Sequence, residues 1–314
     1  MNELSASIKQ HLSQAREEVL AARKSENIND PIDTHVMDYI GMMFSQLFIK
    51  LHIIPNVVTV LSLISGVCGG VLLACDRIWL TVVGVVLVFL SAVFDCSDGQ
   101  VARLTKHYSR IGRMLDGFSD SCVYMSLYVA CAVRLYPRCP INSPALRVIV
   151  LGALVIATFL LFVVQSQLPD YFKNLHMFMI DNSHGNELSR AKHIKAELKA
   201  APKHSFQRLS LFFYYQYTHQ QERRAPYTQK LLDAIEVNGK SDDVCDAFYE
   251  TSRKLVMLTN LLTFNLRTIV LMICFFLHWE LAGMLFVFVV LEPIRIVLLK
   301  RYERLSRNLL PLVH

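Results

Sequence analysis

Charged residues are scarce in this sequence of 314 residues. Lys, Arg, Asp and Glu make up 18% of it, against roughly a quarter in an average soluble domain. Glycine and proline are also few, at 12 and 10 residues, while hydrophobic residues reach 53%, which excludes a disordered or collagen-like chain. The net charge of +6 is modest, and we expect no nucleic-acid partner. The composition is too apolar for a soluble domain and indicates a membrane protein.

The eight cysteines are irregularly spaced, and no pair forms a CxxC motif. A secreted scaffold held by disulfides is therefore excluded. A structural zinc site is not expected either, because such sites usually take cysteines in closely spaced pairs.

Six apolar segments have about the length that crosses a bilayer, which is roughly 20 residues. They cover residues 54–74, 78–94, 111–132, 146–168, 255–277 and 281–299. Only three residues separate the last two segments, which predicts a tight hairpin with Trp279 at the membrane interface. The expected fold class is an all-α polytopic membrane protein with six transmembrane helices.

The segments between the spans give the expected organisation of the chain. It consists of a cytoplasmic N-terminal region (1–53), transmembrane helices 1–4 (54–168), a cytoplasmic helical insert (169–254), transmembrane helices 5–6 (255–300) and a cytoplasmic tail (301–314). Segments 1–53, 98–113, 169–254 and 300–314 hold 5, 4, 13 and 4 basic residues, whereas the other loops hold four in total. Because Lys and Arg favour the cytoplasmic side, both termini are expected there.

Just before the first span, apolar residues recur on one side of a helical pattern. They are Val36, Ile40, Met43, Phe44, Leu47, Phe48 and Leu51. A helix of this kind beside a span usually lies in the headgroup plane, although packing on other protein segments is the alternative. A weaker stripe in residues 1–28 predicts a solvated helix.

The insert is the part that the sequence explains least. A helix is expected over 187–200, ending before Pro202. The aromatic run at 212–217 fits either a membrane-interface belt or a protein core, and core is the commoner case. No histidine has metal-ligand spacing such as HExxH.

Four carboxylates stand at the ends of the second and third spans: Asp95, Asp98, Asp116 and Asp120. Ionisable residues at membrane depth are costly and indicate a functional site. The first two are three residues apart and the last two are four apart, so each pair shares one helical face. If the two helices pack side by side, all four carboxylates converge.

Converging carboxylates need cations, because unpaired like charges repel strongly where the dielectric constant is low. Oxygen ligands suit Mg²⁺ or Mn²⁺, and we expect two ions. A salt-bridge cluster with nearby Arg and Lys side chains is the alternative. It does not explain why small residues share the acidic faces, whereas a bulky ligand that must approach the backbone does. These small residues are Gly99, Ala102 and Gly112.

These residues form a pattern that resembles a known family signature. It reads Asp95-Cys96-Ser97-Asp98-Gly99-Gln100-Val101-Ala102-Arg103, eight residues, Gly112, three residues, Asp116, three residues and Asp120. All eight fixed positions of the CDP-alcohol phosphotransferase signature (the CDP-alcohol phosphatidyltransferase family, here of bacterial type) are matched. Pro55-Asn56 and Thr59 also resemble the start of that family's first helix. The resemblance covers about 31–168 and 255–300, but neither the insert nor the first 30 residues.

The resemblance implies a six-helix enzyme, usually a homodimer, that takes a CDP-activated substrate and releases CMP. The metals would be held by Asp95, Asp98, Asp116 and Asp120. Asp120 would also accept the proton of the acceptor hydroxyl as catalytic base. CDP would be bound by Asp98, Gly99, Ala102, Arg103, Gly112, Asn56 and Thr59.

Two transfer directions occur in the family. A CDP-linked lipid can donate a phosphatidyl group to a polar alcohol, or a CDP-linked headgroup of the ethanolamine or choline type can donate to a lipid alcohol. Six spans resemble the first type, and an overall resemblance to bacterial inositol-lipid synthases favours inositol or inositol phosphate as acceptor. Arg267, Arg295 and Lys173 are candidate acceptor-binding residues, since intramembrane cations normally face a polar cavity and a partner. Arg295 could instead pair with Glu292.

Two further classes of protein are compatible with parts of the pattern. A channel or transporter with an acidic cation site would scatter acids along the membrane depth, whereas these four cluster on the cytoplasmic side. A catalytically dead scaffold would be expected to lose a metal ligand first. We therefore expect a phospholipid-synthesising transferase of the bacterial inner (cytoplasmic) membrane, in contact with membrane lipids and with its active site facing the cytoplasm.

Overall fold

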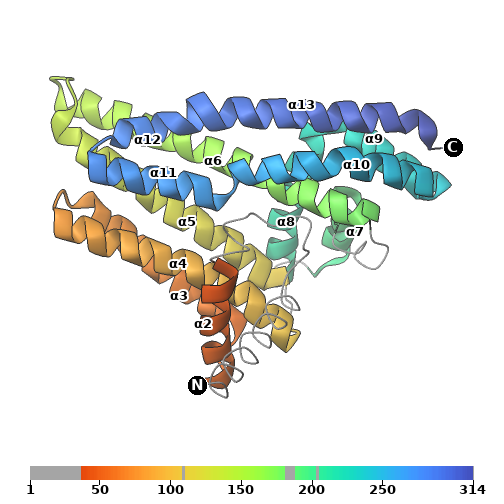
Figure 1. Ribbon diagram of the computed structural model, residues 1–314, viewed down its shortest axis with the longest axis horizontal. Helices are drawn as coiled ribbons and strands as arrows, with labels where there is room; N and C mark the ends of the chain where they lie inside the picture. The colour runs from red at the N-terminus through yellow and green to blue at the C-terminus, as the bar shows by residue number, and fades with distance from the viewer. Residues whose placement is uncertain (1–36, 108–109, 181–187, 203–204, 314) are drawn as a thin grey trace, which may run out of the picture. The chain divides into compact units, whose positions relative to one another are not determined.

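The computed structural model describes residues 37–107, 110–180, 188–202 and 205–313. Within these ranges every regular element is a helix, which confirms the all-α fold expected from the sequence. The chain divides after Leu151 into two compact units (Figure 1). The expected helix over residues 1–28 lies outside the described part of the chain.

The first unit is built from four helices and one short turn. They are α2 (Asp38–Lys50), α3 (Pro55–Ala74), α4 (Ile78–Thr105), α5 (Arg110–Leu135) and the 3₁₀ helix η2 (Tyr136–Arg138). Pro55 opens α3 in the first turn, where its missing N–H and fixed φ suit a helix start. Lys106 ends α4 with a positive φ of 57°. The acidic motif between Asp95 and Arg103 therefore lies wholly inside α4, as its helical spacing requires.

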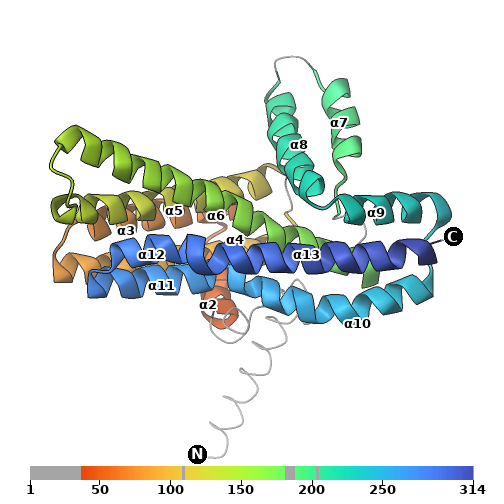
Figure 2. The same cartoon turned by 90° about the horizontal axis from the view of Figure 1, so that it is seen from above.

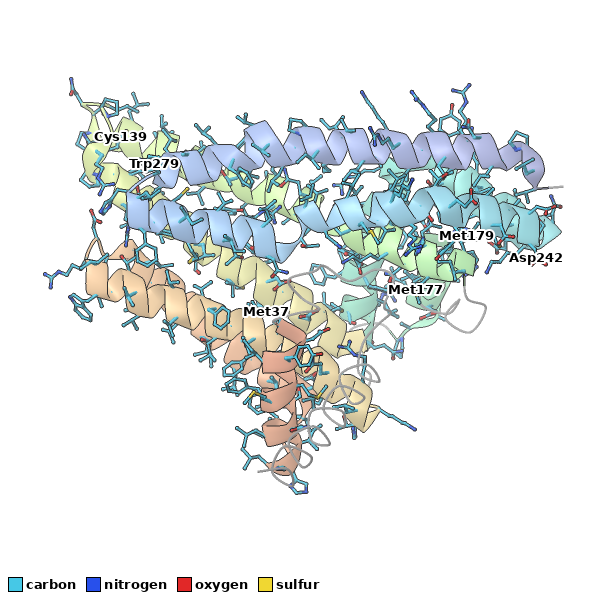
Figure 3. All side chains as sticks on the ribbon, viewed as in Figure 1. Met37, Cys139, Met177, Met179, Asp242 and Trp279 are labelled. Atoms are coloured by element: carbon cyan, nitrogen blue, oxygen red, sulfur yellow. The ribbon has the colours of Figure 1, made fainter. Side chains whose placement is uncertain are left out.

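The second unit begins within α6 (Pro144–Ile180) and continues to the C-terminus. Its other elements are α7 (Ala191–Ala200), α8 (Phe206–Arg224), α9 (Pro226–Asn238), α10 (Asp242–Thr259), η4 (Asn260–Leu262), α11 (Phe264–Leu277), α12 (Glu280–Phe286), η5 (Val287–Leu291, a π turn), α13 (Glu292–Leu309) and η6 (Leu310–Leu312). Trp279 lies in the short turn between α11 and α12, as the sequence predicted. Asp242 starts α10 at the other end of this unit (Figure 3).

Five stretches of the described chain are long and apolar enough to cross a membrane. They are Pro55–Ala74, Ile78–Thr105, Pro144–Ile180, Asp242–Leu277 and Glu280–Leu312. Each contains one of the expected spans, except that the first stretch begins one residue later than expected. The remaining expected span, 111–132, lies in α5, which is 26 residues long but is not among the five. The chain is thus an all-α integral membrane protein, and the count of six spans is not confirmed.

Two of the spans are less regular than a single apolar helix. The expected fifth span is interrupted by η4, where the Thr263 hydroxyl donates to the Asn260 carbonyl at 2.6 Å. The sixth contains the π turn η5 just before Pro293, which follows Glu292 at the start of α13. Proline lacks an N–H and crowds the preceding turn, so a widened turn at this position is the expected accommodation.

Small and hydroxyl residues bring α3 unusually close to α4 and α5. The Ser62 hydroxyl donates to the Ser91 carbonyl and the Ser91 hydroxyl to the Ser62 carbonyl, both at 2.8 Å. A Cβ added to Gly69 would lie 2.9 Å from the Gly84 carbonyl oxygen of α4, and one added to Gly66 would lie 2.5 Å from Val123 of α5. In a membrane, where apolar burial drives helix association little, such small-residue contacts and interhelical hydrogen bonds hold helices together.

A buried arginine fixes the other end of this three-helix group. Arg134 of α5 is 2% exposed, and its guanidinium donates to the Leu73 carbonyl at 2.5 Å and the Cys75 carbonyl at 3.3 Å. It also donates to the Thr81 hydroxyl of α4 at 2.5 Å and lies 3.8 Å from Asp76. These carbonyls end α3 and have no partner within their own helix, so a cation is well placed there.

The amphipathic segment before the first span forms α2, as expected. Its packed side mixes large apolar residues, Met42 and Phe48, with Gly41 and Ser45, which contact α4. Met43, Leu47 and Leu51 are exposed on the helix or just after it. Exposed apolar residues beside a span are consistent with the expected position in the headgroup plane.

In the insert, the helix expected over 187–200 is present as α7, with Ala191 and Ile194 buried. The aromatic run of α8 is divided between two environments. Tyr214 and Tyr215 pack against the small core of α7 and α8, whereas Phe212 and Phe213 are exposed. The core interpretation of this run is therefore correct only in part.

We predict that Gly69→Ala destabilises the protein, whereas Gly152→Ala does not. The new methyl at Gly69 would press on the backbone of α4, and overpacking of this kind costs about 1–3 kcal/mol. A methyl at Gly152 of α6 would meet no atom within 4 Å. Thermal unfolding in detergent, followed by circular dichroism, compares the two. Equal melting temperatures would show that α3 and α4 are not in close backbone contact.

Candidate active site

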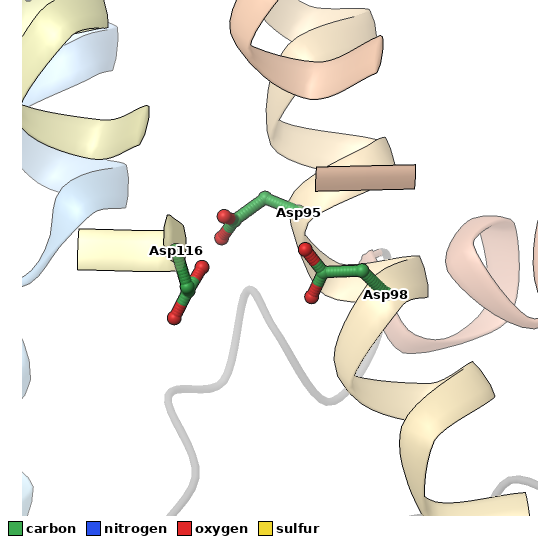
Figure 4. A group of neighbouring side chains, drawn as sticks. All are labelled: Asp95, Asp98 and Asp116. Carbon is green, nitrogen blue, oxygen red and sulfur yellow. The ribbon is translucent and has the colours of Figure 1, made fainter. Parts of the chain in front are cut away.

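Three carboxylates from two helices meet in the first unit. Asp95 and Asp98 come from α4 and Asp116 from α5, and one oxygen of each lies within 4.8 Å of the others (Figure 4). Asp98 is buried, and the other two are partly buried. The convergence predicted from the helical spacing is therefore present for these three residues.

Asp120, the fourth predicted ligand, lies one turn after Asp116 on α5. It is not part of the group of three, but its carboxylate is near enough to repel those of Asp95, Asp98 and Asp116 electrostatically. This position suits a group that acts on a ligand bound next to the three-carboxylate cluster. Its role as metal ligand and base stays a prediction.

The cluster is chemically suited to a divalent cation. Oδ1 of Asp95 is buried and has no hydrogen-bond partner, although a buried carboxylate oxygen without one is costly. All the ligand atoms are carboxylate oxygens, which are hard donors that suit Mg²⁺ or Mn²⁺. A cation between the three groups would satisfy the Asp95 oxygen and offset the mutual repulsion of the carboxylates.

Thr59 fixes the orientation of Asp98. Its hydroxyl donates to Oδ2 of Asp98, and Thr59 itself is 3% exposed in the second turn of α3. The sequence resemblance placed Thr59 in CDP binding. The contact in the structure gives it a positioning role, because the bond leaves the other oxygen of Asp98 to face the cluster.

The back of α4 is held by a polar seam with α2 that the sequence analysis did not identify. The Ser45 hydroxyl donates to the Ser97 carbonyl at 3.1 Å and to Oε1 of Gln100 at 2.9 Å. Gln100 in turn donates to the Asp38 carbonyl at 3.1 Å, and the Ser97 hydroxyl to the Gly41 carbonyl at 3.0 Å.

Since Ser97 and Gln100 lie on the opposite face of α4 from Asp95 and Asp98, the seam sets the direction in which the acidic face points. The available signal was a Gly and a Ser four residues apart in an amphipathic helix.

The remaining motif residues surround the cluster. Gly99 lies beneath the guanidinium of Arg103, since a Cβ added to Gly99 would be 3.3 Å from Nη1 of Arg103. Arg103 also interacts electrostatically with Asp98, which places a cation one helical turn from the carboxylates. Asn56, Ala102 and Gly112 are each partly buried. The CDP-binding role of these residues is a prediction that the structure does not test.

The predicted acceptor-binding residues all lie in the second unit. Arg267 of α11 is 1% exposed and donates to Oε1 of Gln165 at 2.9 Å. Arg295 makes a bidentate pair with Glu292, so the pairing left open in the sequence analysis is present. Lys173 is partly buried in α6. Their part in binding an acceptor remains a prediction.

Residues 52–180 match the model of the CDP-alcohol phosphatidyltransferase family. This stretch contains α3, α4 and α5 with every residue of the carboxylate cluster. It is therefore a CDP-alcohol phosphatidyltransferase domain, and the family expected from the motif is confirmed for these residues.

A 71-residue stretch is 39% identical to a CDP-diacylglycerol–glycerol-3-phosphate 3-phosphatidyltransferase of Cereibacter sphaeroides. It covers 22% of this chain and 32% of that relative, so the chain spans about a third of the relative's length. No solved structure matches the chain.

We predict that the purified protein binds Mn²⁺ and that Asp116→Asn weakens this binding by roughly tenfold or more. Mutation of residues that only hydrogen-bond to a metal ligand already lowers metal affinity by roughly 10–100-fold. Asn keeps the size of the side chain but removes the negative charge. Asp246→Asn, on the exposed surface of α10, is the matched control and should bind as the wild type does. Titration followed by electron paramagnetic resonance measures free Mn²⁺. Equal affinity in the two variants would remove Asp116 from the metal site.

Proposed function

We propose that this protein transfers a phosphatidyl group from a CDP-linked lipid, CDP-diacylglycerol, to the hydroxyl of a polar alcohol and releases CMP. The single observation that carries the proposal is the three-carboxylate cluster inside the CDP-alcohol phosphatidyltransferase domain. The name of the Cereibacter relative supports CDP-diacylglycerol as donor. Transfer from a CDP-linked headgroup to a lipid alcohol is the alternative direction.

The reaction needs charge neutralisation and a base. The acceptor oxygen attacks the phosphorus that carries the lipid, the bond from that phosphorus to the bridging oxygen breaks, and CMP leaves with the electron pair. The acceptor is a poor nucleophile until its proton is removed, and we assign that proton to the carboxylate of Asp120. Asp120 suits this role because it lies beside the cluster of three rather than within it.

Asp95, Asp98 and Asp116 would hold Mg²⁺ or Mn²⁺, and we propose two ions, with Asp120 on the second. When bound, the ions would neutralise the pyrophosphate and stabilise the charge that develops on CMP. The chain's own residues then orient the donor. Arg103 would pair with a phosphate, since a guanidinium suits phosphate oxygens. The cytidine would be received by Gly99, Ala102 and Gly112, with Asn56 and Thr59 at its edge.

For the acceptor, we propose a polar alcohol that carries a phosphate. Inositol phosphate or inositol is favoured by the overall resemblance of the sequence to bacterial inositol-lipid synthases. Glycerol 3-phosphate is favoured by the name of the Cereibacter relative. Arg267, Arg295 and Lys173 are the proposed phosphate-binding residues. The Gln165 contact would then orient the guanidinium of Arg267, and the Glu292 pair would orient that of Arg295.

We further propose a homodimer in the bacterial cytoplasmic membrane, with the site on the cytoplasmic side. The orientation is supported by the distribution of Lys and Arg in the sequence. Cross-linking in membranes and protease accessibility from either side test these two points separately.

We predict that CMP is released from CDP-diacylglycerol only when Mg²⁺ or Mn²⁺ and an acceptor alcohol are both present. Purified protein in detergent would be supplied with labelled CDP-diacylglycerol and, in separate reactions, inositol, inositol phosphate, glycerol 3-phosphate and serine. Excess EDTA should abolish release in each reaction. A CDP-ethanolamine donor with diacylglycerol tests the reverse direction. Full turnover in EDTA would contradict the metal proposal, and ion flux without CMP release would favour a channel.

We predict that Asp120→Asn lowers turnover by about 10²–10⁴-fold, the usual effect of losing a general base, while donor affinity changes little. Asp95→Asn should lower both, because its carboxylate belongs to the platform that holds metal and pyrophosphate. Calorimetry with CDP-diacylglycerol in Mg²⁺, beside single-turnover rates, separates the two effects. A near-normal rate for Asp120→Asn would mean that another group accepts the proton.

A further inference from the structure

The positive charge of this chain is concentrated in one helical hairpin. Residues 188–225, which contain α7 and α8, hold eight Lys and Arg and two Glu, a formal charge of +6 that equals the charge of the whole chain. Three lysines, Lys192, Lys195 and Lys199, are exposed and share one face of α7. The rest of the sequence is therefore neutral on balance, so this hairpin carries the net excess of positive charge.

The same hairpin presents apolar side chains outward. Leu209, Phe212 and Phe213 are spaced as neighbours on one face of α8, and they are 52%, 44% and 55% exposed. The opposite face of α8 is packed, with Leu211 and Thr218 buried. Further along the outward face, toward the C-terminal end of α8, lies the exposed Arg223. Large apolar residues combined with basic ones on an exposed helix are the pattern of a helix that lies on a membrane.

α8 contacts α6 where the apolar part of α6 ends, so the exposed apolar face of α8 lies at the depth of the membrane surface. α6 has no charged residue from 148 to 169, which is about the length needed to cross the hydrocarbon core, and Asp170 follows directly. The C-terminal half of α8 contacts α6 at this boundary. The Tyr217 hydroxyl donates to Asp170 at 3.1 Å, Gln221 to the Gln167 carbonyl at 3.3 Å and Arg224 to Oε1 of Gln167 at 2.5 Å.

The direction of α8 fits the same conclusion. Figure 2 shows α7 and α8 as a hairpin that projects to one side of α6 and α13, at a steep angle to them rather than along them. A helix that lies at a steep angle to the spans, at the level where they leave the bilayer, runs along the membrane surface. Its base is fixed by ion pairs of Arg190 and Lys192 with Asp233 and Glu236 of α9, so the hairpin is held in this direction.

We propose that the α7–α8 hairpin docks on the membrane surface, with Leu209, Phe212 and Phe213 inserted among the headgroups and Lys195, Lys199 and Arg223 held by anionic phospholipids. Charge complementarity and the depth of the α6 contact favour this occupant over a second copy of the chain or a soluble protein. Each basic residue near an anionic surface strengthens the association by on the order of fivefold.

The test is a tryptophan placed on the outward face. Full-length Phe212→Trp is reconstituted into vesicles of phosphatidylcholine, with or without phosphatidylglycerol, that contain lipids brominated near the headgroup. The emission of the parent protein, which has two tryptophans, is subtracted. We expect the added emission to shift to shorter wavelength and to be quenched by bromine, more strongly when phosphatidylglycerol is present. Val237→Trp, at an 82% exposed position of α9, is the matched control and should not be quenched.

The charge requirement is tested by Lys195→Glu/Lys199→Glu in the Phe212→Trp background. This change should remove the extra quenching in phosphatidylglycerol vesicles, whereas Lys230→Glu on α9 should not. If the extent of quenching changes neither with phosphatidylglycerol nor with the lysine substitutions, the proposed recognition of anionic headgroups is wrong. A tryptophan that bromine does not quench would overturn the proposal altogether. Emission at long wavelength would then show that this face of α8 is in water, and emission at short wavelength would show that it packs against protein. None of these readouts depends on transferase activity.

Discussion

Electrostatic repulsion among three carboxylates is the constraint around which the first unit is organised. Asp95, Asp98 and Asp116 approach within 4.8 Å at the ends of apolar helices, where water screens charge poorly. No fold would hold them together without compensation, and the buried oxygen of Asp95 has no hydrogen-bond partner to provide it. A divalent cation is the compensation that fits an all-oxygen donor set, and the same cation is what a pyrophosphate substrate needs.

The surrounding helices make this arrangement rigid rather than merely close. Reciprocal serine bonds and glycines hold α3 against α4 and α5, so their axes have little freedom to separate. On the back of α4, the seam of Ser45, Ser97 and Gln100 fixes its rotation, and on the front the Thr59 hydroxyl orients Asp98. Apolar side chains alone would allow slippage, because lipid tails are as apolar as the helices themselves. Polar contacts give the site its geometry.

The carboxylate cluster could be predicted from the sequence, whereas the hydrogen bonds that hold it in place could not. Carboxylates at i and i+3 or i and i+4 determine which face of a helix is acidic, whatever packs around it, so the convergence of Asp95, Asp98 and Asp116 followed from spacing. The bond from Thr59 to Asp98 joins residues 39 positions apart, and no local pattern encodes it. The same holds for the Ser45 contacts with α4.

Elsewhere, local signals were outweighed by tertiary packing. The expected fourth span, 146–168, is only part of a longer helix, because α6 continues past Pro169 to Ile180. The aromatic run of α8 was assigned as a block, but its members point to opposite sides of one helix, so Tyr214 is packed while Phe212 is exposed. For Arg295, the sequence offered either a ligand or Glu292 as partner, and only the coordinates show the pair.

The central claim, that carboxylates of α4 and α5 jointly hold a divalent cation, is tested most directly by anomalous diffraction from crystals grown with Mn²⁺. The account predicts an anomalous peak between Asp95, Asp98 and Asp116, at roughly 2.0–2.2 Å from an oxygen of each helix. A peak bound by one helix only, or a cluster that stays empty while Mn²⁺ binds elsewhere in the protein, would contradict it.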